Sequence, residues 1–216
     1  MPAPTLLYLH GFRSSPASSK ARATARRVEQ INQERLEAGA LPVRWLCPQL
    51  PASPADAIAL CRNLLGDAFP DDLCLIGSSL GGFYATYLAN TLGCRAALLN
   101  PAVDPARDLR AQIGTQTAWH DPGLAFTFTA EHVQELLALE IGDLRQPVPH
   151  PERFYAVVAK GDEVLDWREM AARYAGATLT LLDGGDHALS DYALHHLDPV
   201  LRWCGLLPGV ASSPST

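Results

Sequence analysis

The chain has 216 residues, of which 48% are hydrophobic and 19% are charged, and its formal net charge is −6. A composition this apolar argues against disorder, and the acidic balance offers no basic surface for nucleic acid or anionic lipid. The length favours one compact domain with a core large enough for a layered fold.

Short apolar runs alternate with longer helical patterns along the chain. Strands are predicted at residues 5–10, 43–47, 73–77, 95–100, 154–159 and 177–182, and helices at 19–37, 55–65, 80–91, 167–174 and 190–203. The strands show no polar–apolar alternation, which indicates a parallel sheet that is buried on both faces. We therefore expect an α/β fold with about six mainly parallel strands, helices on both faces, and ligands at the carboxyl ends of the strands.

One segment of about fifty residues, 102–152, interrupts this alternation and shows no clear strand. It contains one predicted helix, residues 130–141, whose apolar residues repeat at helical spacing. A segment this long inside a compact domain is usually functional. We expect a small cap inserted over the strand ends of a single domain, residues 1–206, followed by a disordered tail at 207–216.

The cysteines and the N-terminal sequence indicate the cellular compartment in which we expect the protein. The five cysteines are scattered without a CxxC pair, namely Cys47, Cys61, Cys74, Cys94 and Cys204. Scattered cysteines in apolar stretches are typical of reduced, buried thiols. The N-terminus lacks the features of a signal peptide, and no apolar run is long enough to span a bilayer. We therefore expect a soluble cytoplasmic protein.

The stretch Gly-Ser-Ser-Leu-Gly at residues 77–81 contains the motif G-x-S-x-G in one register only, with Ser79 at its centre. A sharp strand-to-helix turn there would strain the serine backbone, and the flanking glycines remove the side chains that would collide. Ser78 has Ile76 and Leu80 at the flanking positions and cannot hold that geometry. Ser79 is therefore the predicted nucleophile.

A serine nucleophile needs a base to take its proton and an acid to orient that base, and in such sheets the acid and then the histidine follow the serine. Of seven histidines, His187 alone directly follows a strand end, in LLDGGDHALSD, where two glycines permit a tight excursion toward the serine. His187 is the predicted base. The others precede the serine, lie in or beside the cap, or fall in the last helix: His10, His120, His132, His150, His195 and His196.

The acid is expected after the strand at 154–159. Three residues there qualify by type, namely Asp162, Glu163 and Asp166. Asp166 begins a capping-box spacing with Glu169, so its carboxylate is expected to accept helix amides. Asp162 directly follows a glycine at the strand end and is the predicted acid. Asp183 and Asp186 lie close to the histidine in sequence and stay open as alternatives.

Acyl transfer also needs hydrogen-bond donors where the carbonyl oxygen becomes negative. The amide of Leu80, directly after the nucleophile, is the first expected donor. The second comes from the loop after the neighbouring strand, here LHGFRSSPASS, so the amide of Phe12 is predicted to complete the oxyanion hole. For Arg13, contact with a substrate carboxylate or phosphate and a solvated surface role both stay open.

Together these stretches resemble the α/β-hydrolase superfamily and, more narrowly, the YqiA-type small bacterial esterases. The resemblance runs from about Thr5 to Trp203 and rests on YLHGFRSSPASSKA, IGSSLGGFYATYLA, LLNPAV, GDEVLD and GGDHAL. It implies a three-layer α/β-hydrolase fold without the first two strands of larger hydrolases. It also implies the same triad, Ser79, Asp162 and His187, and hydrolysis of carboxylic esters.

The sequence thus predicts a serine esterase that cleaves small to medium acyl substrates through an acyl-enzyme, with neither a metal nor an organic cofactor. An acyl-CoA-type thioesterase is the alternative, and a non-catalytic binding protein is the rival from a different class. Faint support for a thioesterase comes from a basic run, Arg13, Lys20, Arg22, Arg26 and Arg27, which a solvated helix face also explains. The expected partner is a small-molecule ester or thioester, not nucleic acid or a membrane, and the oligomeric state is left open.

Overall fold

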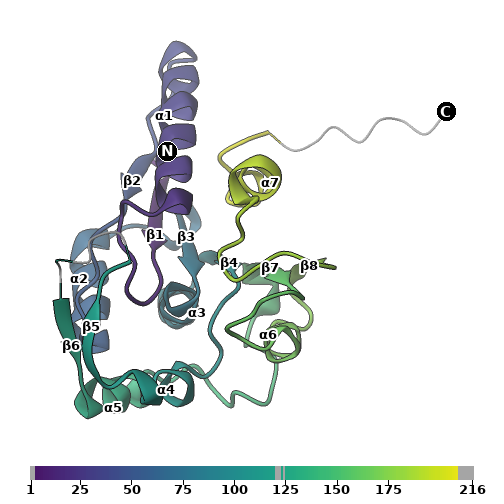
Figure 1. Ribbon diagram of the computed structural model, residues 1–216. Helices are drawn as coiled ribbons and strands as arrows, with labels where there is room; N and C mark the ends of the chain where they lie inside the picture. Colours follow the sequence, from purple (N-terminus) through teal and green to yellow (C-terminus); the bar gives the residue numbers. More distant parts are fainter. Residues whose placement is uncertain (1–2, 120–122, 124, 209–216) are drawn as a thin grey trace.

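A sheet of six strands runs through the middle of the molecule in the order β2-β1-β3-β4-β7-β8, and each neighbouring pair is parallel (Figure 1). The computed structural model describes residues 3–119, 123 and 125–208. The strands are β1 (Thr5–Leu9), β2 (Arg44–Leu46), β3 (Leu73–Ser78), β4 (Arg95–Leu99), β7 (Phe154–Ala159) and β8 (Thr178–Leu182). Each lies at a predicted strand, so the expected parallel sheet is confirmed. The central strands β1, β3, β4 and β7 are almost entirely buried, whereas the edge strands β2 and β8 bury no residue completely, which corrects the expectation of burial on both faces for these two.

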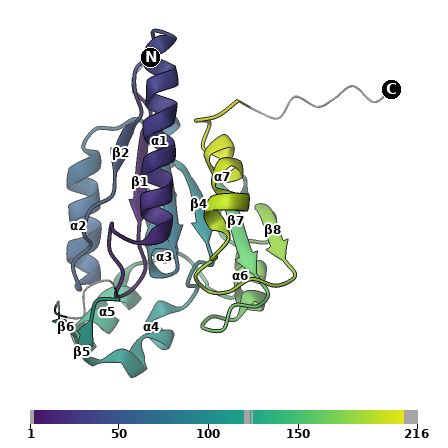
Figure 2. The ribbon, with the colours of Figure 1, turned by 45° about the horizontal axis from the view of Figure 1, so that its top comes forward.

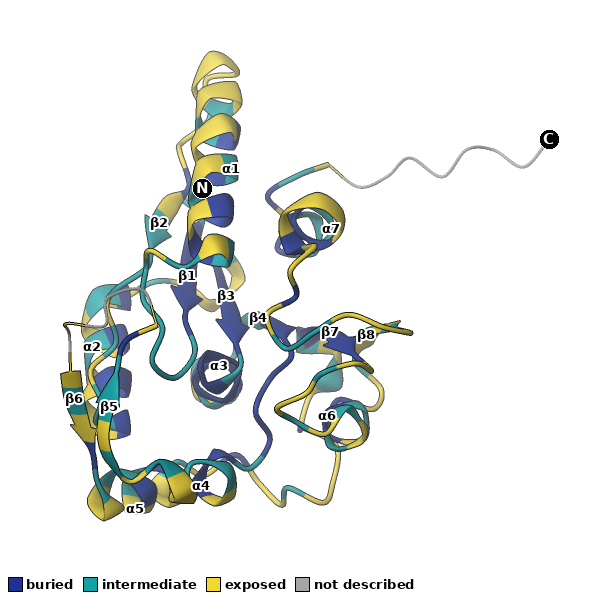
Figure 3. Cartoon of the chain, in the orientation of Figure 1, coloured by how far each residue is buried: buried dark blue, intermediate teal, exposed yellow. Residues whose placement is uncertain are grey.

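Helices cover both faces of this sheet (Figure 2). One face carries α1 (Ser19–Glu37) and α7 (Leu197–Trp203), and the other carries α2 (Pro54–Leu65), α3 (Leu80–Leu92) and α6 (Trp167–Arg173). Successive strand residues point to opposite faces. In β1, Leu6 and Tyr8 join the core under α1 and α7, whereas Leu7 and Leu9 join the core under α2, α3 and α6. Figure 3 shows the result as buried central strands between helices whose outer faces are exposed, with the edge strands β2 and β8 less buried.

The last predicted helix, residues 190–203, is not one continuous α-helix. It consists of a π-helical turn, Tyr192–His196, followed by α7. Pro199 in the first turn of α7 has no N–H to donate four residues back, and its ring would crowd the carbonyl group there. A regular α-helix therefore cannot continue unbroken from the preceding turn into α7.

The segment 102–152 contains two strands, which corrects the expectation that it has none. Its elements include α4 (Pro105–Asp108), β5 (Gly114–Thr117), β6 (Ala125–Phe128) and α5 (Ala130–Ala138). The strands β5 and β6 pair antiparallel as a hairpin. The sequence of β5, Gly-Thr-Gln-Thr, has no apolar run because the strand is at most half-buried. The helix α5 also ends three residues earlier than the predicted boundary at Ile141.

The elements of this cap segment gather beyond the carboxyl ends of β1 and β3, next to α2 and α3 (Figure 1). Phe128, Val133 and Leu136 from the segment are buried in the same apolar core as α2 and α3. The segment is therefore packed against the body of the fold over the edge where ligands of parallel sheets bind.

All five cysteines are free, and four of them are buried, as the sequence predicts. Burial raises the pKa of Cys61 and of Cys94 to about 12, so these thiols stay protonated and pack as small apolar groups. Within the described ranges, no helix combines the length and apolar character that crossing a bilayer requires. Most of the tail predicted at 207–216 lies outside the described residues, since these end at position 208.

Candidate active site

Ser79 occupies a strained turn between the end of β3 and the start of α3. Its backbone angles are φ 55° and ψ −120°, a region that is costly for a residue with a side chain. A Cβ atom added at Gly77 would lie 2.3 Å from the Gly81 carbonyl oxygen, and one added at Gly81 would lie 2.0 Å from the Leu9 carbonyl oxygen. Only glycine fits at either position. The strained residue is Ser79, whereas Ser78 is the buried last residue of β3.

Hydrogen bonds hold this turn in place. The Ser79 amide donates to the Leu99 carbonyl oxygen at 3.0 Å, and the Ser79 carbonyl oxygen accepts from the amides of Gly82 at 2.8 Å and Ala102 at 3.0 Å. Strained backbone persists only where the surroundings over-determine it. Contacts from β4 and from the start of the cap provide that constraint here.

Three predicted site residues from distant parts of the chain form one hydrogen-bonded series. Nε2 of His187 lies 3.1 Å from Oγ of Ser79, and Nδ1 of His187 lies 2.8 Å from Oδ2 of Asp162. A carboxylate can only accept, so Nδ1 carries the proton and Nε2 is free to accept from the serine hydroxyl. The geometry is that of a nucleophile, a base and an orienting acid.

The Asp162 carboxylate is fixed at both oxygens. Its side chain is fully buried, and Oδ1 accepts from the amides of Val164 and Leu165, each at 2.8 Å. Only Oδ2 remains for the imidazole of His187. The turn after β7 therefore aims this carboxylate at the histidine.

Asp166 is the N-cap of α6, as the sequence predicts. Its carboxylate accepts from the Arg168 amide at 2.9 Å. In a capping box, the Glu169 carboxylate would accept a hydrogen bond from the Asp166 amide. Here it instead accepts two bonds from the guanidinium of Arg107, at 2.7 and 2.8 Å. Asp166 thus has a structural role, and Glu169 links α6 to α4 of the cap.

The remaining candidate acids have other partners. Oε2 of Glu163 accepts from the backbone amide of His187 at 3.0 Å, so Glu163 supports the histidine loop without touching the ring nitrogens. Asp183 pairs with Lys160 at 2.6 Å, and Asp186 accepts from the turn that follows it. None of these carboxylates contacts the imidazole.

The other described histidines have structural contacts. His10 is buried, its Nδ1 donates to the Gly11 carbonyl oxygen at 3.0 Å, and its Nε2 accepts from the Leu50 amide at 3.2 Å. It therefore ties the loop after β1 to the loop after β2. His132 completes the N-terminal cap of α5, and Nδ1 of His150 lies 3.3 Å from a carboxylate oxygen of Glu152. Nε2 of His196 lies 3.4 Å from a carboxylate oxygen of Asp191, and the His195 ring packs against that of His196. His120 lies outside the described residues.

Asn100 is a site residue that the sequence reasoning did not single out. It is fully buried with φ 42°, and its Nδ2 donates to the carbonyl oxygens of Asp186 at 3.0 Å and His187 at 3.2 Å. Its Oδ1 accepts from the Ala159 amide at 2.8 Å. Asn100 thereby connects the histidine loop to the strand end that carries the acid. Asparagine is one of the few residues that tolerate a positive φ angle. Its position directly after a strand is therefore the feature of the sequence that could have pointed to this residue.

The histidine loop is also supported from the α1 side. Nζ of Lys20 donates to the Ala188 carbonyl oxygen. Burial lowers the pKa of Lys20 to about 8, against the opposing effect of the nearby Asp186 and Asp162 charges. On the sheet side, a Cβ atom at Gly161 would lie 2.3 Å from the Gly185 carbonyl oxygen, so the acid turn and the base loop are in close backbone contact.

A cleft of about 340 Å³ opens above Ser79 and His187. Phe12 and Leu80, whose amides are the expected oxyanion donors, both line it. Leu80 is the first residue of α3, so its N–H has no acceptor within the helix. The loop of Phe12 comes close to the nucleophile, since a Cβ atom at Gly11 would lie 3.2 Å from Cβ of Ser79. The cap contributes mostly apolar residues to the cleft, among them Ala102, Pro105, Leu109 and Trp119.

Arg13 has a role that neither sequence alternative described. Its Nε donates to the Thr117 carbonyl oxygen at 2.7 Å, and a second nitrogen donates to Oγ1 of Thr117 at 3.2 Å. Its guanidinium stacks over the Trp119 ring, 4.0 Å from the centroid. Arg13 therefore fastens the loop after β1 to the cap hairpin.

Comparison with known proteins identifies both the family and the fold. The model of the uncharacterised protein family UPF0227 matches residues 5–204. The chain is also similar to the α/β hydrolase domain-containing protein 10 from mouse, with TM-score 0.61 and 16% identity over 95% of this chain and 88% of that one.

Two further solved structures share the fold at similarly low identity. The esterase domain of a Rhodothermus marinus protein matches with TM-score 0.60 and 19% identity over 94% of this chain and 87% of that one. The fluorophosphonate-binding serine hydrolase F of Staphylococcus aureus matches with TM-score 0.58 and 16% identity over 94% and 84%. The chain belongs to the uncharacterised protein family UPF0227, and its fold is that of the α/β-hydrolase superfamily.

Proposed function

We propose that this protein is a serine hydrolase that cleaves carboxylic esters of small to medium acyl groups through an acyl-enzyme. The observation that carries the proposal is the hydrogen-bonded series from Ser79 through His187 to Asp162, which opens into a cleft. The solved structures that share the fold include an esterase domain and a fluorophosphonate-binding serine hydrolase, and these names agree with the proposal.

In the first half-reaction, Oγ of Ser79 attacks the ester carbonyl carbon while Nε2 of His187 takes the hydroxyl proton. Asp162 holds the imidazole in the required tautomer and stabilises the cation that forms. The amides of Phe12 and Leu80 bind the negative carbonyl oxygen of the tetrahedral intermediate. His187 then gives its proton to the departing alcohol oxygen, which leaves an ester of Ser79.

In the second half-reaction, His187 takes a proton from a water molecule, whose oxygen attacks the acyl carbon of the ester on Ser79. The same amides stabilise the second tetrahedral intermediate. Its collapse returns the proton to Ser79 and releases the carboxylic acid. Each step uses protein groups and water alone, so the reaction requires no metal or organic cofactor.

The cleft favours a small to medium ester. Its volume of about 340 Å³ is near the lower end of the range of ~300–1,000 Å³ for small-molecule pockets. The cap residues that line it are largely apolar, which suits an uncharged acyl or alcohol group.

A thioesterase that accepts a large phosphorylated carrier has weaker support. Several members of the basic run already have protein partners: Arg13 binds Thr117, Lys20 donates to Ala188, and Arg27 pairs with Asp198 at 2.9 Å. These three side chains are therefore not free to form a positively charged entrance that binds phosphate groups. A purely binding role would leave the aligned serine, histidine and aspartate without a purpose.

The test compares Ser79→Ala with Ser78→Ala as its matched control. The assay is a panel of 4-nitrophenyl esters of graded acyl length, together with one acyl-CoA and labelling by a fluorophosphonate probe. Ser79→Ala should lose both labelling and roughly 10³-fold or more of kcat, while circular dichroism shows an unchanged fold. Ser78→Ala should keep both. Ester cleavage near the wild-type rate in Ser79→Ala would overturn the proposal.

A further inference from the structure

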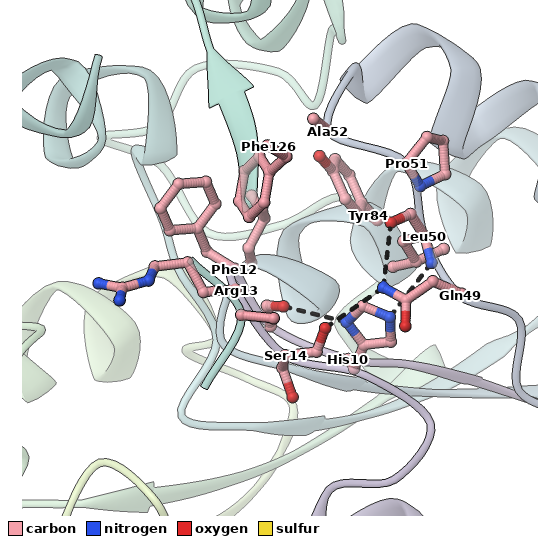
Figure 4. A pocket seen from close by; sticks show the side chains of 13 residues that line it. His10, Phe12, Arg13, Ser14, Gln49, Leu50, Pro51, Ala52, Tyr84 and Phe126 are labelled. Carbon is pink, nitrogen blue, oxygen red and sulfur yellow. Dashed lines mark hydrogen bonds between the residues drawn. The ribbon is translucent and has the colours of Figure 1, made fainter. Parts of the chain in front are cut away.

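A second cavity, of about 200 Å³, lies beside the catalytic cleft (Figure 4). Phe12, Arg13 and Leu80 line both spaces, so the two adjoin at these residues. From there, the second cavity extends toward the loop after β2 and the cap hairpin. Neither Ser79 nor His187 lines it.

The walls of this cavity are mostly apolar and are held by specific contacts. The rings of Phe12 and Phe126 pack edge to face with their centroids 5.7 Å apart. On the opposite side, the Leu50 amide donates to Nε2 of the buried His10 at 3.2 Å, which fixes the loop after β2. The cavity is therefore formed by three elements that are held against one another by these contacts.

The hydroxyl of Tyr84 is the polar group that sets this cavity apart. Tyr84 is only 2% exposed and lies on α3 one turn after Leu80. Figure 4 shows its hydroxyl end beside Ala52 and Phe126, within the ring of lining side chains. Among the residues that the structure describes, none provides a hydrogen-bond partner for this hydroxyl. The hydroxyl oxygen is not one of the described side-chain atoms that are closed off from solvent without a partner, so it opens into the cavity, where a ligand or a water molecule can bind it.

Other buried tyrosines of the chain differ from Tyr84 in this respect. The Tyr174 hydroxyl lies 2.8 Å from Oγ1 of Thr86, and the Tyr192 hydroxyl lies 3.0 Å from Oγ1 of Thr24. Burial raises the pKa of Tyr84 well above its ordinary value, and the nearby Cys61 and Glu135 act in the same direction. Tyr84 therefore keeps its proton at working pH and is available as a donor.

The chemistry of ester cleavage indicates which part of the substrate would enter this cavity. The leaving alcohol must face His187, which protonates it, and the carbonyl oxygen must face the amides of Phe12 and Leu80. The acyl group then extends away from His187. The second cavity lies past Phe12 and Leu80 on the side without the histidine, where the acyl group would go.

We infer that this cavity is the acyl subsite, and that it takes a short acyl chain carrying a neutral hydrogen-bond acceptor, a carbonyl or hydroxyl oxygen, which binds the Tyr84 hydroxyl. The inference rests on the proposed esterase function. The acceptor is neutral because the guanidinium of Arg13, the charged group in the cavity lining, is already engaged by Thr117 and Trp119.

The test uses pairs of 4-nitrophenyl esters that differ by one carbonyl oxygen: pentanoate against 4-oxopentanoate, and hexanoate against 5-oxohexanoate. Each kcat/KM is divided by the rate of alkaline hydrolysis of the same ester to remove intrinsic reactivity. The wild type should prefer the oxo member of at least one pair by roughly three- to tenfold, the value of one neutral hydrogen bond. Tyr84→Phe should abolish this preference.

Tyr87→Phe is the matched control, because Tyr87 lies on the same helix with its ring near Arg62 and lines neither cavity. It should keep the wild-type preference. As a second variant, Ala118→Leu places a larger side chain at the cavity wall, so the ratio of kcat/KM for hexanoate to that for acetate should fall several-fold.

The outcomes separate the two proposals. If wild type and Tyr84→Phe cleave the esters with the same relative rates, water alone completes the Tyr84 hydroxyl and the acyl-subsite inference is overturned. An unchanged hexanoate-to-acetate ratio in Ala118→Leu would also overturn it. If the wild type cleaves no ester of the panel, the esterase proposal itself fails.

Discussion

The carboxyl edge of the sheet and the cap are built in different ways. At the sheet edge, Ser79 and Asn100 hold positive φ angles, and the side chains of Asp162 and Asn100 are fully buried. In the cap, Trp119 is 65% exposed and Leu137 is 53% exposed, and the first hairpin strand buries no residue completely. The first region is over-determined by sterics and hydrogen bonds, whereas the second is held to the body mainly by a few apolar side chains that enter the core under α2 and α3.

This difference indicates how the two regions divide their roles. Proposed catalysis needs atoms positioned within a few tenths of an ångström, and rigid strand ends with close backbone contacts provide that. Substrate choice depends on the shape of the walls, which the less constrained cap and the loop after β2 supply. Changes at the sheet edge should therefore cost far more than changes in the cap.

The largest effect is expected from Asp162→Asn. Oδ1 of Asp162 accepts two backbone amides, so the oxygen of the introduced amide will stay there and its NH₂ group will face Nδ1 of His187. That contact forces the proton onto Nε2, which can then no longer accept from Ser79. We expect kcat to fall by roughly 10²–10⁴.

Steady-state kinetics on a 4-nitrophenyl ester measure this loss, and Asp166→Asn is the control. Asp166 caps α6 four residues away, and an asparagine caps a helix about as well as an aspartate. The control should retain most of its activity. Equal losses in the two variants would refute the assignment of Asp162 as the acid.

Glycine substitutions compare the stability of the two regions directly. Gly81→Ala places a Cβ atom 2.0 Å from the Leu9 carbonyl oxygen, which neither backbone can relieve, so a loss of more than ~3 kcal/mol in the free energy of unfolding is expected. Gly142→Ala in the cap meets no atom within 4 Å and costs only about 1 kcal/mol for its φ of +83°. Urea denaturation measures both, and similar losses would contradict the contrast between the regions.

The features at the sheet edge could be predicted from the sequence because local sterics and burial specify them. A strand buried on both faces must be an unbroken apolar run, and the turn at Ser79 accepts only glycine at positions 77 and 81. The order of acid and base follows from the order of the strands. The contacts now found for Ser79, Asp162 and His187 agree with that reasoning, although their chemistry stays a prediction.

The features that escaped prediction depend on partners far away in the chain. Asn100 donates hydrogen bonds to the carbonyl oxygens of residues 186 and 187, and the sequence around Asn100 contains no pattern that predicts these contacts. In the sequence, Tyr84 cannot be told apart from the other core residues of α3. The helical pattern indicates that its side chain is buried, but not that its hydroxyl has no hydrogen-bond partner among the described residues. The sequence does not predict the hairpin of the cap, because its first strand is polar and at most half-buried.

Asn100→Ala tests whether the histidine loop depends on that long-range contact. The substitution leaves the Ala159 amide and the carbonyl oxygens of Asp186 and His187 without their side-chain partner. We expect a loss of ~2–3 kcal/mol in stability and a roughly tenfold or greater fall in kcat as the imidazole becomes less well placed. Asn63→Ala, at an exposed position of α2, is the control and should change neither quantity. A normal kcat in Asn100→Ala would show that the loop is positioned by its other contacts.

The smallest effect is expected at the ion pair that joins the cap to α6. Arg107 and Glu169 form two bonds of 2.7 and 2.8 Å, but their side chains are 53% and 40% exposed. Solvent and salt screen such pairs, so Glu169→Gln should change the free energy of unfolding by less than about 1 kcal/mol, with the difference shrinking further in 1 M salt. Urea denaturation at low and high salt measures this. A loss above ~2 kcal/mol would mean that this pair, rather than the apolar core of Phe128, Val133 and Leu136, holds the cap on the body. Substrate choice would then respond to ionic strength, which an apolar attachment does not predict.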